Sequence, residues 1–427
     1  MKEKLKQIFI GDKTGLGPHK LILLGLQHTF TMFGATVLVP ILTGLDVSVA
    51  LFMAGLSTLI FHSITKGKVP VFLGSSFAFI APIILVSNKF GMEYALGGIV
   101  VAGVIYIIFS TIMKFIGPER LLKLFPPIVT GPIIAIIGLM LANIAITQAT
   151  DNWWLAFISF AAIATISIFA QGFLKLIPIM CGIVIGYVVG AISGNVDFVP
   201  ISSSQLIGIP NFTLAKFNLE AILIVAPVTI ATMAEHIGDM VAIKEITGKD
   251  IFRDPGLNRT LMGDGVGEVI SGMFGGPAIT TYSENVGVIT LTKVYHPIVM
   301  RIAALFAILL SFFPMVAAII GSIPLGVIGG ASIILFGMIT AIGFRIMIEN
   351  KIDLKDSRNL IVIATIMIFG LGGSMISFGN IELGGVGLAA IIGVFLNRIL
   401  PEKEEEFTGV IEHADPNVRI DYDEEGM

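Results

Sequence analysis

A series of long apolar runs constrains this chain more than any other feature. Such runs recur from about residue 20 to about residue 400, and each is close to the roughly 17–25 residues that a helix needs to cross a bilayer. The chain is 55% hydrophobic and only 13% charged, a composition that excludes a soluble globular domain. It is therefore predicted to be an all-α polytopic membrane protein.

Fourteen of these runs are predicted to be transmembrane spans. They are residues 20–43, 46–64, 69–87, 95–116, 124–147, 154–171, 174–193, 217–243, 261–276, 278–294, 297–319, 323–347, 358–374 and 384–400. With the N-terminus in the cytoplasm, only Lys89 and Lys216 of the 26 Lys and Arg residues fall on the opposite side. The positive-inside rule demands such an asymmetry, so a count of fourteen places both termini in the cytoplasm.

The two halves of the chain contain similar segments in the same order. The pairs are residues 23–34 with 230–241, 72–83 with 279–290, and 125–139 with 323–337. A repeat of about 200 residues then holds seven spans, and because seven is odd, the second copy is inverted in the membrane. Inverted repeats with a site near the midplane are typical of secondary transporters. Chance similarity between apolar helices is the alternative for any single pair.

The two ends of the chain are predicted to lie outside the membrane. Residues 1–19 are basic and amphipathic, and they lack the small-residue cleavage site of a signal peptide, so they are interpreted as a cytoplasmic N-terminal segment. Residues 401–427 carry ten acidic residues against only Lys403 and Arg419, which predicts a solvated acidic cytoplasmic tail.

Two polar stretches interrupt the predicted spans, TTYSEN at 280–285 and GSSFAF at 74–79. Their β-branched and aromatic residues, with alternating polarity, favour an extended strand over a helix. Non-helical backbone survives at membrane depth only where protein buries it or where it lines a cavity. Spans 69–87 and 278–294 are therefore predicted to be broken by short antiparallel strands that pair near the bilayer centre, each followed by a half-helix whose N-terminus points at that region.

Three carboxyl groups are predicted to gather at the same point. Glu235 and Asp239 are four residues apart, hence on one helical face, and Glu284 belongs to the polar stretch 280–285. Carboxyl groups inside a membrane are functional candidates, and a dry pocket disfavours their charged form, so all three are candidates for proton coupling. A carboxyl also suits an imide, because it accepts from N–H and, when protonated, donates to C=O. The alternative is that these acids are neutral packing groups or pair with one another.

Other polar residues of the predicted spans give weaker signals. Gln27 and His28 either line the same cavity or hydrogen-bond between helices. His236, Asp264 and Glu268 are interpreted as structural. The sequence has no metal-ligand spacing, nucleophile elbow or phosphate-binding loop, so no metal, cofactor, enzymatic activity or nucleic-acid partner is predicted.

Several motifs together resemble one known family. The most specific is ENVGVITLTK at 284–293, and AEHIGD, GSSFAFI and RDPGLNRT add to it. With these motifs nearly the whole chain resembles the nucleobase–cation symporters, also called nucleobase–ascorbate transporters. Glu284 and GSSFAFI are typical of the uracil permease branch, whereas xanthine and urate members usually have Gln at the position of Glu284.

The resemblance implies a division into two domains. Residues 20–116 and 217–319, with spans 1–4 and 8–11, correspond to a core domain that holds the substrate. Residues 124–193 and 323–400, with spans 5–7 and 12–14, correspond to a gate domain, which is also the expected surface of a homodimer. The implied protein is a plasma-membrane uracil importer driven by protons. Three alternatives stay open: a purine substrate such as xanthine or urate, sodium coupling, and an anion exchanger or channel of related fold.

The same resemblance assigns roles to individual residues. Glu235 is expected to bind the base through its side chain, and Glu284 is the second functional acid. Phe77 and Ser283 are expected to offer backbone groups to the base, with Tyr282 packed beside it.

Two positions depart from the family pattern. Asp239 stands where the best-known uracil transporter has His, and Phe336 stands where Tyr is common near the site. Gln27, His28, Ser76 and Phe336 are the weaker candidates for lining the pocket.

Overall fold

The computed structural model describes residues 17–116, 126–372, 375–378 and 381–401. The predictions for most of the N-terminal segment and for nearly all of the acidic tail lie outside these residues. The side chains of Ser283 and Glu284, and those of residues 375–384, also lie outside the description.

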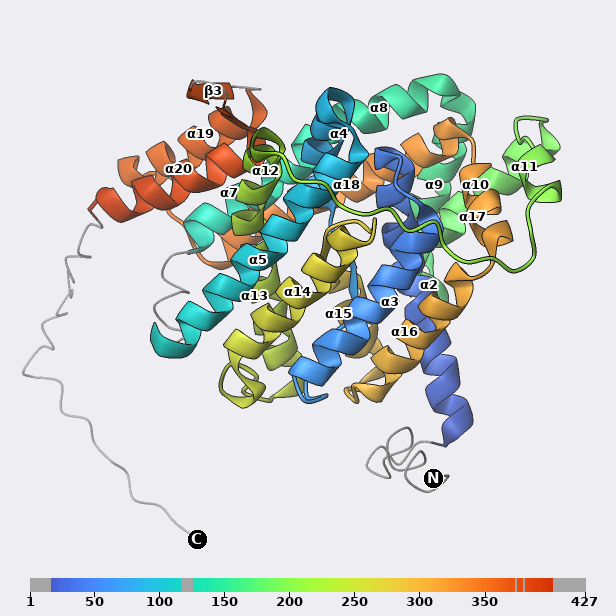
Figure 1. Cartoon of the computed structure of the whole chain (residues 1–427), viewed down its shortest axis with the longest axis horizontal. Helices are drawn as coiled ribbons and strands as arrows, with labels where there is room; N and C mark the ends of the chain where they lie inside the picture. Colours follow the sequence, from blue (N-terminus) through green and yellow to red (C-terminus); the bar gives the residue numbers. More distant parts are fainter. Residues whose placement is uncertain (1–16, 117–125, 373–374, 379–380, 402–427) are drawn as a thin grey trace, which may run out of the picture.

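Helices make up most of the described chain (Figure 1). They are α2 (Pro18–Thr43), α3 (Val47–Ile64), α4 (Ile80–Phe90), α5 (Met92–Ile116), α7 (Pro127–Met140), α8 (Ala142–Asp151), α9 (Trp153–Phe169), α10 (Pro178–Ile192), α11 (Val199–Ser202), α12 (Leu219–Val225), α13 (Thr229–Thr247), α14 (Leu257–Met273), α15 (Ser283–Thr292), α16 (Ile298–Ser311), α17 (Pro314–Gly321), α18 (Leu325–Glu349), α19 (Ser357–Leu371) and α20 (Gly385–Ile399). Short turns of other helix types are η1 (Phe77–Phe79), η2 (Gly172–Leu176), η3 (Ala226–Val228) and η4 (Phe252–Gly256).

Helices of the structure overlap all fourteen predicted ranges. Among the described residues, six helical segments are long and apolar enough to cross a bilayer, or seven if the bent pair α16–α17 is one span. The remaining apolar helices are shorter than 18 residues. The fold is therefore a mostly helical, polytopic membrane-type fold, and the full count of fourteen spans stays a prediction.

Four strands form two short sheets. β1 (Leu73–Ser75) pairs antiparallel with β2 (Ile279–Thr281), in the register Leu73↔Thr281, Gly74↔Thr280 and Ser75↔Ile279. Each strand begins one residue before one of the two polar stretches, 74–79 and 280–285, and overlaps its first two residues. A second antiparallel pair, β3 (Met375–Phe378) with β4 (Ile381–Gly384), precedes α20, and the sequence analysis did not predict it.

Several predicted spans are interrupted rather than continuous. Residues 124–147 contain two helices, α7 and α8, and residues 217–243 contain α12, η3 and part of α13, with Pro227 in the break. In the range 297–319 the axes of α16 and α17 differ by 83°, and Pro314 begins the second helix. Proline lacks a backbone N–H and clashes with the preceding helical turn, so such breaks at Pro227 and Pro314 are expected.

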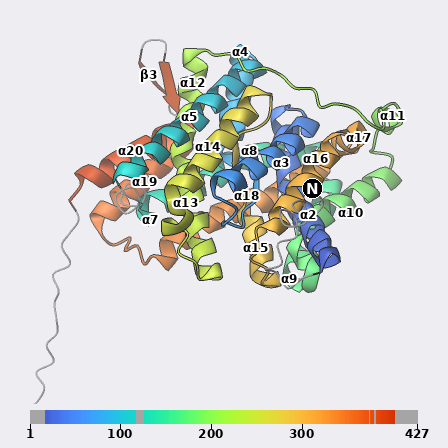
Figure 2. The ribbon, with the colours of Figure 1, turned by 60° about the horizontal axis from the view of Figure 1, so that its bottom comes forward.

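The helices pack in two groups. In the first group, α14 lies between α5 and α3, and α16 packs on α2 and α3, as the middle of Figure 1 shows. In the second group, α18 packs against α7, α8 and α9, α10 packs on α9, and α19 lies between α7 and α20. Figure 2 shows α19 and α20 at one end of the molecule and α10 and α17 at the other. Smaller contacts of α13 with α20 and α2 with α10 join the groups.

Glycines allow the closest helix approaches in the first group. A Cβ on Gly265 of α14 would lie 2.6 Å from Tyr106 Cβ and 2.8 Å from the Gly103 carbonyl oxygen of α5. Real Cβ contacts are not that short, so α5 and α14 can approach this closely only because Gly265 has no side chain.

We expect Gly265→Ala to destabilise the protein and Gly337→Ala not to. Overpacking at Gly265 costs about 1–3 kcal/mol, whereas exposed Gly337 of α18 has open space around its would-be Cβ and Ala favours the helix. The melting temperature in detergent, followed as the loss of the monodisperse size-exclusion peak after heating, measures both. Equal melting temperatures for the two variants would contradict the close approach.

Candidate functional site

Two strands bring the N-terminal ends of two half-helices together. β1 leads through η1 into α4, and β2 leads into α15. The pairing continues beyond the strands, because Ser76 N donates to the Ala278 carbonyl at 2.8 Å and Tyr282 N donates to the Phe72 carbonyl at 3.1 Å. The first N–H groups of a helix have no partner within it, so both half-helices direct donors and partial positive charge toward the strands.

Tyr282 connects the end of β2 to β1 and α2. Its hydroxyl donates to the Ser75 carbonyl oxygen at 3.1 Å and accepts from Thr36 Oγ1 at 3.2 Å. Ser75 Oγ in turn donates to the Thr36 carbonyl oxygen at 3.0 Å. Tyr282 is thus a buried side chain whose hydrogen bonds hold the strand pair against α2, an arrangement here called the Tyr282 brace. Its ring lies directly beside Gly74.

Asp239 contacts the strand pair from α13. Thr281 Oγ1 donates to Asp239 Oδ2 at 2.7 Å, and both side chains are buried. Glu235 is half-buried one helical turn earlier on the same helix. The structure therefore places these two acids on the helix that contacts β2 and α15, while the side chain of Glu284, like that of Ser283, lies outside the described residues.

His28 and Asn285 connect α2 to α15. Asn285 Nδ2 lies 3.3 Å from His28 Nδ1 and donates to the His28 carbonyl oxygen at 3.5 Å. Of the two roles considered for His28, the structure shows the hydrogen bond between helices. Gln27, the residue before it, is half-buried on α2.

Two phenylalanines lie where η1 meets α18. The rings of Phe77 and Phe336 are 6.2 Å apart between centroids and inclined by 72°, an edge-to-face arrangement. Phe336 is buried and Phe77 is half-buried. An aromatic border therefore separates the strand pair from the second group of helices.

Three buried polar atoms next to the strands lack a hydrogen bond within the described part of the chain. They are Ser76 Oγ, Thr280 Oγ1 and Asn285 Oδ1. Buried polar groups are almost always paired, so these three atoms beside the strands are candidates to bond a polar ligand.

Sequence reasoning did not single out four of the contributing residues, Thr36, Ser75, Thr281 and Asn285. The last three lie inside the quoted polar stretches, so their positions were available as a signal. Thr36 lies in an apolar run, and only the packing of α2 against β1 reveals its role.

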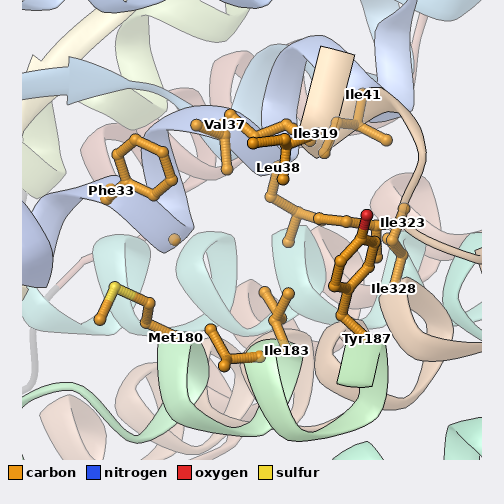
Figure 3. A pocket seen from close by; sticks show the side chains of 13 residues that line it. Phe33, Val37, Leu38, Ile41, Met180, Ile183, Tyr187, Ile319, Ile323 and Ile328 are labelled. Atoms are coloured by element: carbon orange, nitrogen blue, oxygen red, sulfur yellow. The ribbon is translucent and has the colours of Figure 1, made fainter. Parts of the chain in front are cut away.

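A separate apolar pocket of about 130 Å³ lies between α2, α10, α17 and α18 (Figure 3). It is lined by Phe33, Gly34, Val37, Leu38, Ile41, Met180, Ile183, Val184, Tyr187, Ile319, Ile320, Ile323 and Ile328. The Tyr187 hydroxyl pairs with Ser322 Oγ at 2.9 Å. No lining residue carries a charge, so this pocket lacks the groups to recognise a polar ligand, and the strand pair is the better candidate site. In the part of the chain that the structure describes, no group of three or more His, Cys, Asp or Glu residues could hold a metal ion.

Comparison with known protein families and sequences gives a consistent result. A model described as the permease family, of the xanthine and uracil permease type, matches residues 19–377. A probable uracil permease of Pasteurella multocida (strain Pm70) is 42% identical over 392 residues, which cover 90% of this chain and 94% of that protein. The uracil permease of Escherichia coli (strain K12) is 42% identical over 88% of this chain and 90% of its own length. The uracil permease of Bacillus subtilis (strain 168) is 38% identical over 94% and 97%.

Solved structures share the fold at low sequence identity. The transmembrane domain of the cyanobacterial bicarbonate transporter BicA has a TM-score of 0.63 and 16% identity, and covers 88% of this chain and 96% of that chain. The overall structure of SLC26A9 has a TM-score of 0.65 and 11% identity, and covers 88% and 64%.

We expect Gly74→Ala to weaken the Tyr282 brace. The new Cβ would come within 2.3 Å of the Tyr282 ring, so the ring must leave the Ser75 carbonyl, at a cost of about 1–3 kcal/mol in unfolding free energy. Thermal melting in detergent measures the loss. A double-mutant cycle with Tyr282→Ala serves as the control, since Gly74→Ala should cost little once the ring is absent. An equal cost in both backgrounds would show that the ring and Gly74 do not interact.

Proposed function

The chain belongs to the xanthine and uracil permease family, and on that premise we propose that it is a proton-coupled symporter that imports uracil by alternating access. Members of this family are multi-pass membrane transporters rather than enzymes. The observation that carries the proposal is the β1–β2 pair, with two half-helix N-termini and the acids of α13 beside it. The relatives named uracil permease support the substrate.

The proposal includes fourteen spans in two inverted repeats. The core domain comprises residues 20–116 and 217–319, and the gate domain comprises residues 124–193 and 323–400. The division is supported by the two packing groups of helices and by the similarity of fold to solved transporters. The proposed protein is a homodimer through the gate domain, in the plasma membrane, with both termini in the cytoplasm.

Uracil is proposed to bind where β1 and β2 end. Its imide presents N–H between two C=O groups, so a site needs both donors and acceptors. Glu235 is assigned to the side-chain contact, with backbone groups of Phe77 and Ser283 completing the ring of hydrogen bonds. Tyr282 packs beside the base, and Glu284 is the second acid.

Secondary contacts are assigned to Gln27, His28, Ser76 and Phe336. The unpaired Ser76 Oγ supports a direct hydrogen bond to the base. Phe336 stands against Phe77, in a position to limit the size of the ring that the site accepts.

Proton coupling is assigned to the carboxyl groups of Glu235, Glu284 and Asp239. Linkage requires that proton and uracil each raise the affinity for the other. A protonated Glu235 donates to a uracil carbonyl in the outward-open state, and its deprotonation in the inward-open state weakens binding. Asp239 contributes through Thr281, because its carboxylate accepts a hydrogen bond from the Thr281 hydroxyl. A change in the charge of Asp239 therefore alters the contact that holds β2 against α13.

An anion exchanger is the second candidate function, because BicA is a bicarbonate transporter and murine Slc26a9 is an anion transporter. Anion sites need positive charge, whereas the helix beside the strand pair carries Glu235 and Asp239. These acids favour a neutral base over an anion. Purine transport and sodium coupling are the alternatives within the family itself.

We expect Glu235→Gln to lower radiolabelled uracil uptake at least about tenfold, a loss of roughly 1.4 kcal/mol or more, in cells that lack their own permease. The remaining uptake should lose its rise at acidic external pH, because Gln cannot bind the coupled proton. Glu349→Gln on the exposed end of α18 is the matched control. Undiminished, pH-dependent uptake by the Glu235 variant would remove this residue from the mechanism.

We expect Glu284→Gln to admit purines. Gln presents a fixed donor and acceptor, as at this position in xanthine and urate members, so xanthine should begin to compete with labelled uracil. A competition series with thymine, xanthine, urate and cytosine, with and without a proton gradient, measures the change. If neither uptake nor selectivity changes, Glu284 does not determine the substrate class.

A further inference from the structure

A second polar cluster lies behind the strand pair, between α5, α13 and α14. Its side chains are those of Tyr106, His236, Thr260, Asp264 and Glu268, and each of them is 0% exposed. This cluster has no role in the site described above.

The His236 ring lies between Thr260 and Asp264. Thr260 Oγ1 donates to the Leu257 carbonyl at 2.9 Å, so it accepts from His236 Nε2, which lies 2.9 Å away. The other ring nitrogen, Nδ1, lies 2.7 Å from Asp264 Oδ2. Nε2 carries a hydrogen, because it donates to Thr260. One further proton between Nδ1 and the carboxyl oxygen then leaves the pair without net charge, whether that proton is bonded to the ring or to the carboxyl.

Glu268 has no such partner. It lies one turn after Asp264, and neither of its carboxyl oxygens makes a hydrogen bond within the described part of the chain. His236 already compensates Asp264, and an uncompensated buried carboxylate costs several kcal/mol. Glu268 is therefore protonated in this conformation.

The cluster adjoins the proposed substrate site through α13. The Tyr106 side chain of α5 lies against Gly265 of α14, which stands between Asp264 and Glu268 in the sequence. His236, which contacts Asp264, directly follows Glu235 on α13. Glu268 and Glu235 are thus connected through a buried region, where electrostatic interactions are stronger than in water.

Other titratable groups do not face Glu268 closely. Besides the groups already named, α13 carries Asp239, Lys244 and Glu245 and α5 carries Glu93, Tyr94 and Lys114, and of these six only Asp239 is buried. On α14 itself, Arg259 donates to the Ile64 carbonyl at 3.3 Å. Of the other elements packed on α14, β2 has no titratable residue, and α3 has only His62, whose Nε2 lies 2.8 Å from the Val71 carbonyl. η4 has Arg253 and Asp254, and both are exposed.

We propose that Glu268 is a second proton-binding site, which loads and unloads the coupled proton during the transport cycle; this rests on the proposed function. In the inward-open state the proton passes from the Glu268 carboxyl to water of the inward-facing cavity. The carboxylate that remains lies in the same buried cluster as Tyr106, a potential hydrogen-bond donor. Binding of a proton from the outside neutralises Glu268. The neutral Glu268 then lowers the free-energy cost of ionising Glu235.

The test uses the full chain in proteoliposomes and compares two reactions. Exchange of labelled for unlabelled uracil at equal pH needs no net proton movement, whereas accumulation driven by a pH gradient does. Glu268→Gln, which imitates the protonated acid, should keep exchange within about twofold and lose about tenfold or more of the driven accumulation. Glu349→Gln, on the exposed end of α18, should keep both.

The other outcomes decide against the proposal. Retained accumulation by Glu268→Gln would show that the proton never leaves this residue, and loss of exchange as well would show a structural role only. If that variant does not fold, Glu268→Asp replaces it: driven accumulation with a shifted pH midpoint supports the proposal, and an unshifted midpoint overturns it. Absence of uracil exchange by the unaltered protein would instead overturn the proposed function itself.

Discussion

The hydrogen bonds between β1 and β2 are the interaction on which the rest of the architecture depends. An apolar chain cannot leave backbone N–H and C=O groups unpaired in hydrocarbon, yet a polar ligand can be bound there only by groups that are not already committed to a helix. Pairing Leu73–Ser75 with Ile279–Thr281 resolves this conflict, because the strands satisfy each other while η1 and α15 begin shortly after them, and the first N–H groups of a helix have no partner within it. Tyr282 secures the arrangement from one side and Asp239 from the other. The site is thus assembled by backbone geometry first and by side-chain chemistry second.

Close helix packing surrounds this strand pair, and it is tight within each of the two helix groups. Gly265 lets α14 approach α5, and in the second group a Cβ on Gly138 of α7 would lie 2.3 Å from the Phe336 carbonyl of α18. Between the groups the contacts are fewer, and the apolar pocket of Figure 3 lies along this boundary, between α2 on one side and α10 and α18 on the other. Motion of one group against the other is the movement that alternating access needs; buried apolar side chains of α4, α5, α7, α19 and α20 also meet across this boundary. The edge contact of Phe77 with Phe336 spans the same boundary beside the strands.

Much of the helical layout could be predicted because run length is a property of the sequence alone. The range 46–64 corresponds to α3, Val47–Ile64, and the range 384–400 to α20, Gly385–Ile399. The alternating polarity of the two quoted stretches likewise indicated strands. The partners of individual polar groups could not be predicted, since they depend on the rotation and register of helices far apart in the chain. That Asp239 accepts from Thr281, and that His236 meets Asp264, follows from how α13 packs on β2 and α14. The β3–β4 pair was missed because residues 375–383 were treated only as the connection between two spans, although Gly379-Asn380 between the runs MISF and IELG is a two-residue hairpin signal.

Helix α13 is where these constraints converge. Three nearby residues of this helix have different surroundings. Glu235 is half-buried, His236 contacts Asp264 of α14, and Asp239 accepts a hydrogen bond from Thr281 of β2. Because one rigid helix carries all three, a change of charge at one of them is felt at the others without any long chain of intermediate residues. Three of the few ionisable groups in the predicted spans, Glu235, His236 and Asp239, lie on α13, the helix that contacts β2. The helix that carries Glu235 therefore also packs on α14, which carries the buried Glu268, and this is the physical basis of the proposed linkage between substrate and proton binding.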